Sequence, residues 1–297
     1  MKILTIIITY NPELQTLKKL INSLDSQIID KKIQNNIIIV DNNSNNIDEI
    51  INIKLNNIEI ISLNDNMGIA YAQNVGLKKA INDRYDFAML SDQDTAYPNN
   101  YISTLVPHIT NEVAAIGSMF IDTNLNRLSG FVQKIDYGAW KIKQPTEGTY
   151  EVKQLIASGK IINVSCIKDI GLMMEELFID YVDLEWCWRA ISRNYKVLIN
   201  ADINLSHKLG NEKANISQKR SYALRSYKRY YFLVRNGVYL SIYNPGKLLA
   251  TYERFVIFSK SVIYIAVYSI NTPKLKNLKY CLKGFYHALI KKLGNSL

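Results

Sequence analysis

The chain has 297 residues, of which 48% are hydrophobic and 21% charged, a composition typical of a packed globular protein that excludes a disordered chain. The three cysteines, at positions 166, 187 and 281, are far apart, so neither a disulfide framework nor a cysteine-based zinc site is expected. The net charge of +10 is unevenly distributed along the sequence.

Strand-like and helical patterns alternate through the first ninety residues. Apolar runs predict strands at Ile3–Thr9, Ile37–Val40, Ile58–Leu63 and Phe87–Leu90. The spacing of apolar residues predicts helices over residues 14–24 and 68–82. Continuously apolar strands separated by helices indicate a buried, mostly parallel sheet, so the expected fold class is α/β. The sequence contains neither GxGxxG nor GxxxxGK[ST], which argues against a Rossmann dinucleotide fold and a P-loop.

The second half of the chain changes character twice. Residues 118–165 are broken by Gly and Pro into short strands and turns, and a helix over residues 183–193 and a strand over residues 196–199 follow. Long helices are then predicted over Ser217–Asn236, Pro245–Ser269 and Lys274–Lys292. The longest apolar run, residues 255–270, is interrupted at positions 259–261, and the N-terminus lacks a signal-peptide pattern. We therefore expect a cytoplasmic protein that is not integral to the membrane.

The charge division separates the same two parts of the chain. Residues 208–297 contain 17 Lys or Arg and two acidic residues, a net of +15, whereas residues 1–207 have a net of −5. Eleven of the 20 tyrosines also lie beyond residue 208. Such asymmetry predicts two regions with different partners, the second favouring an anionic one. We expect domains at residues 1–210 and 211–297.

Polar residues follow two of the predicted strands, and a glycine begins a predicted helix. Asp92-Gln93-Asp94 follows the fourth, where two carboxylates one residue apart can bind a divalent cation and substrate phosphates. Taken alone, this motif is more often a helix cap. Asp41 follows the second strand, where a carboxylate can bind a nucleotide base or ribose, although an Asx turn is the simpler interpretation. Gly68 begins a helix whose N-terminus favours an anion and allows close backbone approach.

A second acidic cluster comprises Asp180, Asp183 and Glu185, among aromatic residues. Acids at a helix start are favoured by the helix dipole, which is the simplest interpretation. Partial desolvation by the aromatic neighbours would instead raise the pKa of Asp183, as a general base requires. His207 follows another strand-like run and is kept as a candidate ligand, although a lone His is more often a packed residue.

Taken in order, these pieces resemble glycosyltransferase family 2, and most of all its rhamnosyltransferase-like bacterial members. The matching segments extend over about residues 1–210: IIITYNP, IVDNNS, NMGIAYAQNVG (66–76), LSDQD, SG (158–159), IG (170–171) and FIDYVDLEW. The resemblance implies a GT-A fold that binds a nucleotide sugar, followed here by the basic helical region. Gln93 departs from the acid or small residue of many relatives, which puts a metal contact at that position in doubt.

The resemblance also implies roles for individual residues. The expected donor-binding residues are Thr9, Asn11, Asp41, Asn66, Gly68, Asn74 and Asp92. Mg²⁺ or Mn²⁺ would be bound by Asp94, with Asp92 and His207 as further metal contacts. Asp183 would be the catalytic base.

The expected function is an inverting glycosyltransferase that moves a sugar, L-rhamnose from dTDP-L-rhamnose, onto a cell-surface polysaccharide such as O-antigen. The expected acceptor is an undecaprenyl-diphosphate-linked glycan, and the basic region is expected to bind the anionic inner face of the cell membrane. Two alternatives remain: a metal-dependent nucleotidyltransferase, and a nucleic-acid-binding module formed by the basic region. We favour the membrane over nucleic acid, and a homo-oligomer is compatible with the sequence.

Overall fold

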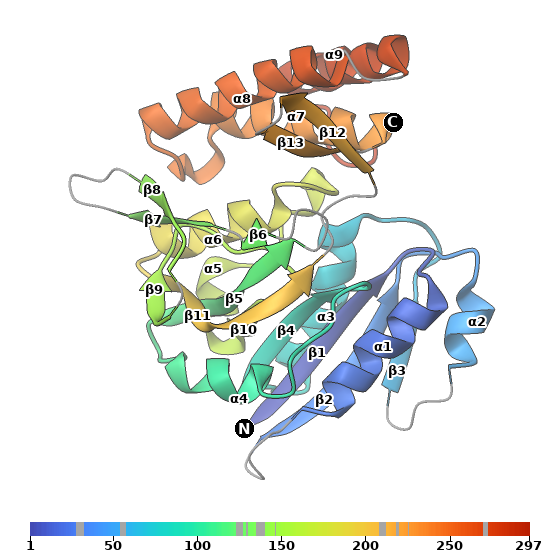
Figure 1. Ribbon diagram of the computed structural model, residues 1–297, viewed down its shortest axis with the longest axis vertical. Coiled ribbons are helices and arrows are strands. Elements are labelled where there is room, and N and C mark those ends of the chain that lie inside the picture. Colours follow the sequence, from blue (N-terminus) through green and yellow to red (C-terminus); the bar gives the residue numbers. More distant parts are fainter. Residues whose placement is uncertain are drawn as a thin grey trace.

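The computed structural model describes residues 1–27, 33–53, 58–122, 127–128, 130–134, 140–145, 147–207, 212–217, 220–224, 226–269 and 273–297 (Figure 1). The expected boundary between residues 210 and 211 lies outside these ranges and stays a prediction.

One large sheet forms the centre of the molecule. Its strands lie in the order β3 (Ile58–Ser62), β2 (Gln34–Asp41), β1 (Lys2–Thr9), β4 (Phe87–Asp92), β10 (Ile161–Asn163), β5 (Val113–Asp122), β11 (Lys196–His207) and β9 (Thr149–Glu151), and β6 (Arg127–Leu128) pairs with β5. The first four strands of this order are mutually parallel. Because β10 is antiparallel to both β4 and β5, strands β5 and β11 point the same way as β1. The prediction of an α/β fold with a mostly parallel sheet is confirmed.

Helices cover both faces of the sheet (Figure 1). One face packs on α1 (Leu14–Asp25), α2 (Ile47–Ile51) and α4 (Tyr101–Leu105), and the other on α3 (Ile69–Asn82), α5 (Ile167–Ile170) and α6 (Val182–Ser192). The side chains of β1 alternate between the two cores: Ile6 faces α3, and Ile7 faces α1. A Cβ on Gly76 would lie 2.4 Å from Ile6, so glycine allows α3 to pack directly on β1.

Shorter elements connect these layers. The 3₁₀ turns are η1 (Val106–His108), η3 (Val164–Cys166), η4 (Glu175–Leu177) and η5 (Pro245–Lys247). Two separate hairpins pair β7 (Phe131–Lys134) with β8 (Trp140–Lys143), and β12 (Glu212–Ser217) with β13 (Arg220–Leu224).

Three helices form the C-terminal region: α7 (Tyr227–Tyr243), α8 (Thr251–Ser269) and α9 (Lys274–Leu289). The predicted helix over Ser217–Asn236 is wrong in its first half, which forms the β12–β13 hairpin instead. The helix begins after Ser226, whose side chain accepts a hydrogen bond from the backbone N–H of Arg229, and it runs on to residue 243. No helix in the described ranges is long and apolar enough to span a membrane.

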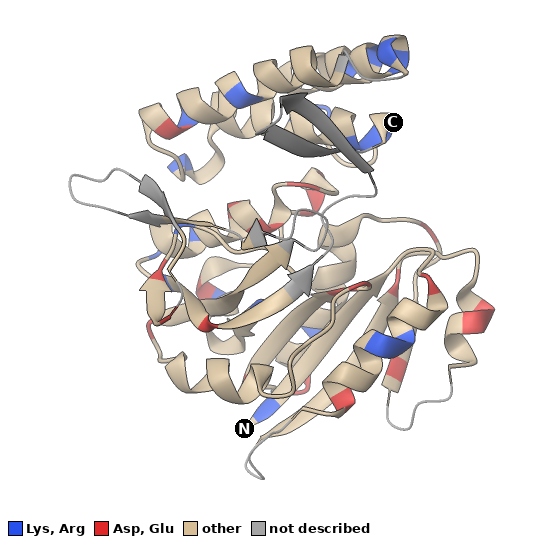
Figure 2. Cartoon of the chain, viewed as in Figure 1, with Lys and Arg blue, Asp and Glu red and all other residues tan. Residues whose placement is uncertain are grey.

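Helix α7 joins the C-terminal region to the sheet domain. Phe178, which precedes α6, stacks on Phe232 of α7 with ring centroids 4.9 Å apart. A second contact joins the two regions: Lys153, which follows β9 of the sheet domain, forms an ion pair with Glu253 of α8. Lys and Arg lie on all three of these helices (Figure 2), and four of them lie on α9.

Candidate active site

The site lies where β1, β2 and β4 end side by side. Thr9 is paired in register with Asp41, and Ile8 with Asp92, so the carboxyl ends of the three strands meet at one edge of the sheet. The chain order β3-β2-β1-β4 reverses direction between β1 and β4. In open α/β sheets, ligands bind outside the carboxyl ends of the strands at such a reversal. A hollow lined by Ser62, Asn64, Asp65 and Tyr71 lies at the neighbouring end of β3.

Asp41 connects the ends of β1 and β2. Its Oδ1 accepts a hydrogen bond from the Thr9 hydroxyl at 2.7 Å and one from the Ser44 hydroxyl, and its Oδ2 accepts one from the Ser44 amide at 2.8 Å. Thr9 and Asp41 are completely buried. Asn11, at a positive φ of 48°, accepts from the Asn45 amide. The structure thus shows Asp41 fixing the loop of residues 42–45, and its contact with a base stays a prediction.

Asn66 and Gly68 lie at the start of α3. The Asn66 side-chain oxygen accepts from the Asn42 side chain at 3.0 Å and from the Gly68 amide at 3.1 Å. The first amide of α3, that of Ile69, donates to the carbonyl of Phe178 at 2.8 Å. Gly68 has a φ of 87°, and a Cβ there would lie 2.6 Å from that carbonyl. The close approach that glycine allows is therefore to residue 178, which leads into the acidic cluster.

The acidic motif after β4 divides into three environments. Asp92 is half-buried and accepts a hydrogen bond from the Ser158 hydroxyl. Gln93 points back to β1, where its side-chain oxygen accepts from the Tyr10 amide at 2.7 Å. Asp94 is exposed at the turn that follows. The glutamine therefore fixes the backbone of the motif and leaves the two outer carboxylates at the site edge.

His207 ends β11 opposite Asp122, and its side chain lies outside the described part of the chain. Among the described residues, no three His, Cys, Asp or Glu side chains form a group that could hold a metal ion. The three predicted metal contacts thus stay a prediction.

The acids of the second cluster differ in their partners. Glu185 is 3% exposed and forms two hydrogen bonds with Arg189, at 2.9 and 2.8 Å. Asp180 forms an ion pair with Arg229 of α7 at 3.1 Å. Asp183 accepts one hydrogen bond within the described residues, at 3.1 Å from the amide of the next residue, Leu184. Among the described residues, Asp183 is therefore the acid of this cluster that forms no ion pair.

The surroundings of Asp183 suit a proton acceptor. Burial raises the pKa of its carboxyl, the positive charge of Lys160 opposes the rise, and the carboxylates of Asp92 and Asp180 add to it. Lys160 is completely buried, with Nζ 3.3 Å from the backbone oxygen of Asp183 and 5.7 Å from the Trp186 ring centroid. A raised pKa strengthens the carboxylate as a base, and the nearby cation limits how far it rises.

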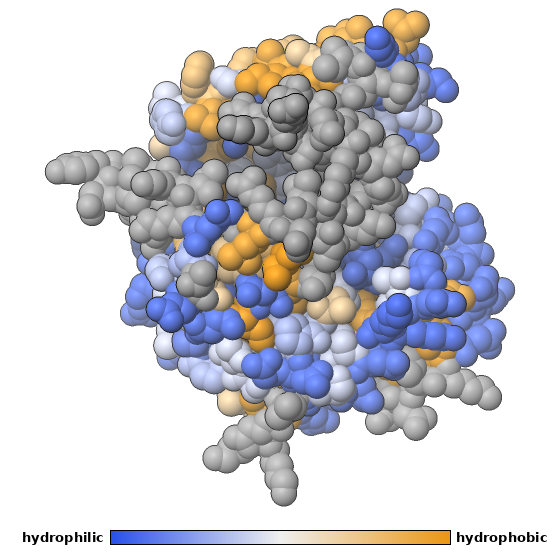
Figure 3. Space-filling model, in the orientation of Figure 1, coloured by the Kyte–Doolittle hydropathy of each residue, from blue (hydrophilic) through white to orange (hydrophobic). Residues whose placement is uncertain are grey.

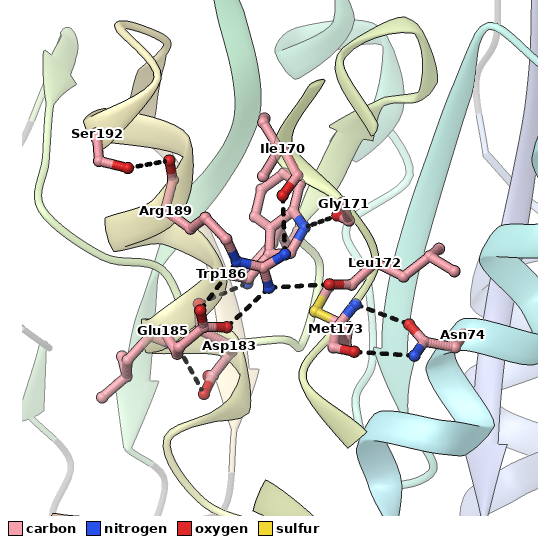
Figure 4. A network of polar contacts seen from close by, with 12 residues as sticks. Asn74, Ile170, Gly171, Leu172, Met173, Asp183, Glu185, Trp186, Arg189 and Ser192 are labelled. Atoms are coloured by element: carbon pink, nitrogen blue, oxygen red, sulfur yellow. Dashed lines mark hydrogen bonds and ion pairs between the residues drawn. The ribbon is translucent and has the colours of Figure 1, made fainter. Parts of the chain in front are cut away.

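Figure 4 shows how α6 is fixed to the sheet domain. Arg189, held by Glu185, donates to the carbonyls of Ile170 and Leu172, both at 2.8 Å. The Asn74 side chain on α3 donates to the Met173 carbonyl at 2.9 Å and accepts from the Met173 amide at 2.8 Å. Asn74 and the Glu185–Arg189 pair thus hold opposite ends of the segment formed by residues 170–173. The predicted role of Asn74 near the diphosphate stays a prediction.

The segment before Asp183 has an unusual backbone held by α7. Three non-glycine residues adopt positive φ angles: Phe178 at 65°, Asp180 at 63° and Tyr181 at 66°. The buried side-chain amide of Asn236 donates to the carbonyls of residues 177, 179 and 180 at 2.8–2.9 Å. Arg235 donates to the carbonyl of residue 177 at 2.9 Å. Such strained conformations persist where the surroundings hold them in place, and they cluster at functional sites.

Sequence reasoning missed Lys160, Arg229, Arg235 and Asn236. Lys160 directly follows the recognised Ser158-Gly159 pair, so its position offered a signal. The three residues of α7 lie within a basic, tyrosine-rich stretch whose composition gives no sign of contacts with residues 49 or more positions away in the sequence.

The chain is similar to known proteins in sequence and in fold. The family model described as glycosyl transferase family 2 matches residues 5–171. The chain is 33% identical over 262 residues to dTDP-rhamnosyl transferase RfbF of Shigella flexneri, an alignment covering 86% of this chain and 85% of that protein.

Two solved structures share the fold at low sequence identity. The mannosyltransferase PcManGT of Pyrobaculum calidifontis, in complex with GDP-Man and Mn²⁺, has a TM-score of 0.60 and 11% identity, covering 98% of this chain and 87% of that one. S. aureus TarS 1–349, in complex with UDP-GlcNAc, has a TM-score of 0.56 and 18% identity, covering 97% and 81%.

Proposed function

The chain belongs to glycosyltransferase family 2 and is a glycosyltransferase, and we propose that it transfers L-rhamnose from dTDP-L-rhamnose to a hydroxyl of a growing cell-surface polysaccharide. The observation that carries the proposal is the position of Asp183. It is a half-buried carboxylate without an ion pair to the other described residues, and the charge of Asp92, at the edge where β1, β2 and β4 end, acts on it. The rhamnosyl donor is supported by the similarity to the Shigella flexneri transferase.

In the proposed reaction, Asp183 accepts the proton of the acceptor hydroxyl as that oxygen attacks the anomeric carbon. The bond from this carbon to the donor's phosphate oxygen breaks, and the nucleoside diphosphate leaves on the opposite face. A single displacement of this kind inverts the configuration of the sugar, as in inverting glycoside hydrolysis. A base of this type contributes about a hundredfold or more to the rate.

The outer carboxylates of the acidic motif fit a divalent cation. Mg²⁺ is typically held by one or two carboxylates, the substrate phosphates and water, and Asp92 and exposed Asp94 supply two such carboxylates at the site edge. We propose that these residues hold Mg²⁺ or Mn²⁺, with His207 as a further contact. Bound there, the cation would neutralise the charge of the departing diphosphate.

We also propose that the C-terminal region binds the anionic inner face of the cell membrane, where an undecaprenyl-diphosphate-linked acceptor would lie. Large apolar side chains are exposed along α8 and α9, among them Tyr252 at 72% and Leu275 at 84%. Figure 3 shows hydrophobic surface gathered over these two helices. Exposed lysines lie on the same helices or directly after α9: Lys260, Lys274, Lys276, Lys279, Lys291 and Lys292. Apolar side chains beside lysines suit an anionic lipid surface.

The donor is tested by calorimetric titration of the full chain, with Mn²⁺, against dTDP-L-rhamnose, UDP-GlcNAc and GDP-mannose. We expect dTDP-L-rhamnose to bind at least about tenfold more tightly than the others, and dTDP to be released when lipid-linked saccharides are added. EDTA and Asp94→Ala should each abolish that release. Preference for another nucleotide sugar would overturn the donor, and pyrophosphate release from a nucleoside triphosphate would favour the nucleotidyltransferase alternative.

A further inference from the structure

The candidate site carries an excess of negative charge that a diphosphate would meet. Asp92, Asp94, Asp180 and Asp183 contribute four carboxylates at or near the carboxyl edge of the sheet. A donor diphosphate is itself anionic, so its binding requires positive charge that can reach it. A divalent cation at the acidic motif supplies part of that charge, and the remainder has to come from side chains.

Two cationic side chains in the described part of the chain act on these carboxylates, and they differ in their exposure to solvent. Lys160 is completely buried beneath Asp183, so a ligand arriving from solvent cannot contact it. The side chain of Arg229, on the first turn of α7, is 44% exposed, whereas that of its partner Asp180 is 7% exposed. Arg229 is therefore the cation of the pair that a ligand can contact.

The ion pair with Asp180 leaves part of the guanidinium available. Nε and Nη2 donate to the Asp180 carboxylate at 3.1–3.2 Å, while Nη1 donates to no acceptor among the described residues. Burial lowers the pKa of Arg229, but Asp180, Asp92 and Asp183 outweigh burial and raise it overall. The guanidinium thus lies within the electrostatic reach of both the nucleotide edge and the catalytic base.

From this geometry we infer that Arg229 binds the diphosphate of the donor through the solvent-facing edge of its guanidinium, with Asp180 as the positioning residue that aims it. The inference rests on the proposed function and extends it, because it makes the basic C-terminal region part of the donor site. A guanidinium suits this role, since its planar set of donors matches phosphate oxygens.

The test compares two ligands that differ only in the diphosphate. Thymidine diphosphate and thymidine are titrated with Mn²⁺ into the full-length wild type and into Arg229→Gln. Hydrogen bonds to charged groups predict a loss of about 10- to 100-fold in diphosphate affinity. Thymidine affinity should stay within about twofold. Equal weakening of both ligands, or diphosphate affinity within about twofold of wild type, would overturn the inference.

Matched variants separate a specific contact from general charge. Lys228→Gln removes an exposed cation from the neighbouring position and should leave diphosphate affinity within about twofold. A loss as large as that of Arg229→Gln would show a general field effect and overturn the contact. If thermal unfolding shows Arg229→Gln to be misfolded, Arg229→Lys is used instead, and it should lose at least about threefold for the diphosphate alone.

The titration of the wild type distinguishes failure of the proposed function from failure of the inference about Arg229. If the wild type binds uridine or guanosine diphosphate but not thymidine diphosphate, the proposed rhamnosyl donor is wrong. The same variants are then titrated with the nucleoside diphosphate that binds. If it binds no nucleoside diphosphate, the proposed function fails and the inference fails with it. Wild-type binding that Arg229→Gln leaves unchanged refutes the inference alone.

Discussion

The sheet domain and the C-terminal helices contribute to the site in different ways. The strands β1, β2 and β4 bring Thr9, Asp41 and Asp92 together because parallel strands in register must end at one edge. Helix α7 contributes through contacts with the segment before Asp183. Asn236 donates hydrogen bonds to three carbonyls of that segment, and Arg229 forms an ion pair with Asp180. The first contribution follows from the order of strands, and the second from individual side-chain contacts.

The difference shows that the basic helices do more than offer a surface for the proposed membrane contact. Gly294, near the C-terminus, donates its amide to the carbonyl of Glu176, and Arg235 donates to the Gly294 carbonyl. Removal of residues beyond about 240 would therefore disturb the segment that leads into Asp183. A truncation cannot separate membrane binding from catalysis, so the comparison is better tested by point substitutions.

The largest effect is expected at Asp183, in the sheet domain. Asp183→Asn keeps the shape of the side chain but cannot accept a proton at neutral pH, so turnover should fall at least about a hundredfold. Donor affinity, measured by titration, should stay near that of wild type. Near-normal turnover, together with loss of activity in Asp180→Asn or Glu185→Gln, would move the base to another acid. If none of the three variants loses activity, the inverting mechanism is wrong.

The next effect is expected at Asn236, in the C-terminal region. Asn236→Ala removes three hydrogen bonds from a segment with positive φ angles, so it should lower the unfolding temperature and reduce turnover about tenfold. The matched control is Asn277→Ala on α9, a buried asparagine that donates to the Tyr268 carbonyl. The control should lose stability and keep turnover at temperatures where it is folded. Equal loss of turnover in both variants would indicate a general packing effect.

The sequence predicted the sheet domain better than the C-terminal region for a physical reason. Strand order and strand ends follow from local apolar runs, so the positions of Asp41 and Asp92 were predictable from their neighbours. The hydrogen bonds of Asn236 depend on how two distant segments pack, and no local pattern encodes that. The helix predicted over Ser217–Asn236 was wrong only in its first half, because the apolar spacing there also suits strands, and the Ser226 cap sets the true start of α7.

The third prediction concerns the exposed apolar side chains of α8 and α9. Replacing Phe255 and Leu282 with Ser should weaken binding to vesicles containing anionic lipid about tenfold, because each loses apolar area that would enter the interface. Ile51→Ser with Ile81→Ser, which changes two exposed apolar residues of the sheet domain, is the control and should bind as wild type. Sedimentation with vesicles over a range of salt measures both. Unchanged vesicle binding together with a shift of RNA or DNA would favour the nucleic-acid alternative.

The smallest effect is on stability, and it distinguishes a buried carboxyl group with a raised pKa from an ordinary surface carboxyl group. Burial raises the pKa of Asp183 above the usual value of an aspartate, so the folded state binds this proton more tightly than the unfolded state. The contribution of Asp183 to stability therefore falls as the pH rises from its pKa in the unfolded state to its pKa in the folded state. Above the folded-state pKa, the full cost of ionising the buried carboxyl group is present. Asp183→Asn lacks this penalty and should unfold a few degrees higher than wild type at neutral pH, with the difference shrinking in acid.

Asp202 in β11 provides the control of opposite sign. Its pKa is lowered by hydrogen bonds from the Gly148 amide and the Asn200 side chain, so ionised Asp202 stabilises the folded state at neutral pH. That stability is lost as pH falls through the lowered pKa, and Asp202→Asn should unfold below wild type at neutral pH. Thermal unfolding of both variants and of the wild type between about pH 3 and 8 measures the two signs. If Asp183→Asn is destabilised like Asp202→Asn, the ionised Asp183 carboxylate stabilises the folded state. Its assignment as a base with a raised pKa is then wrong.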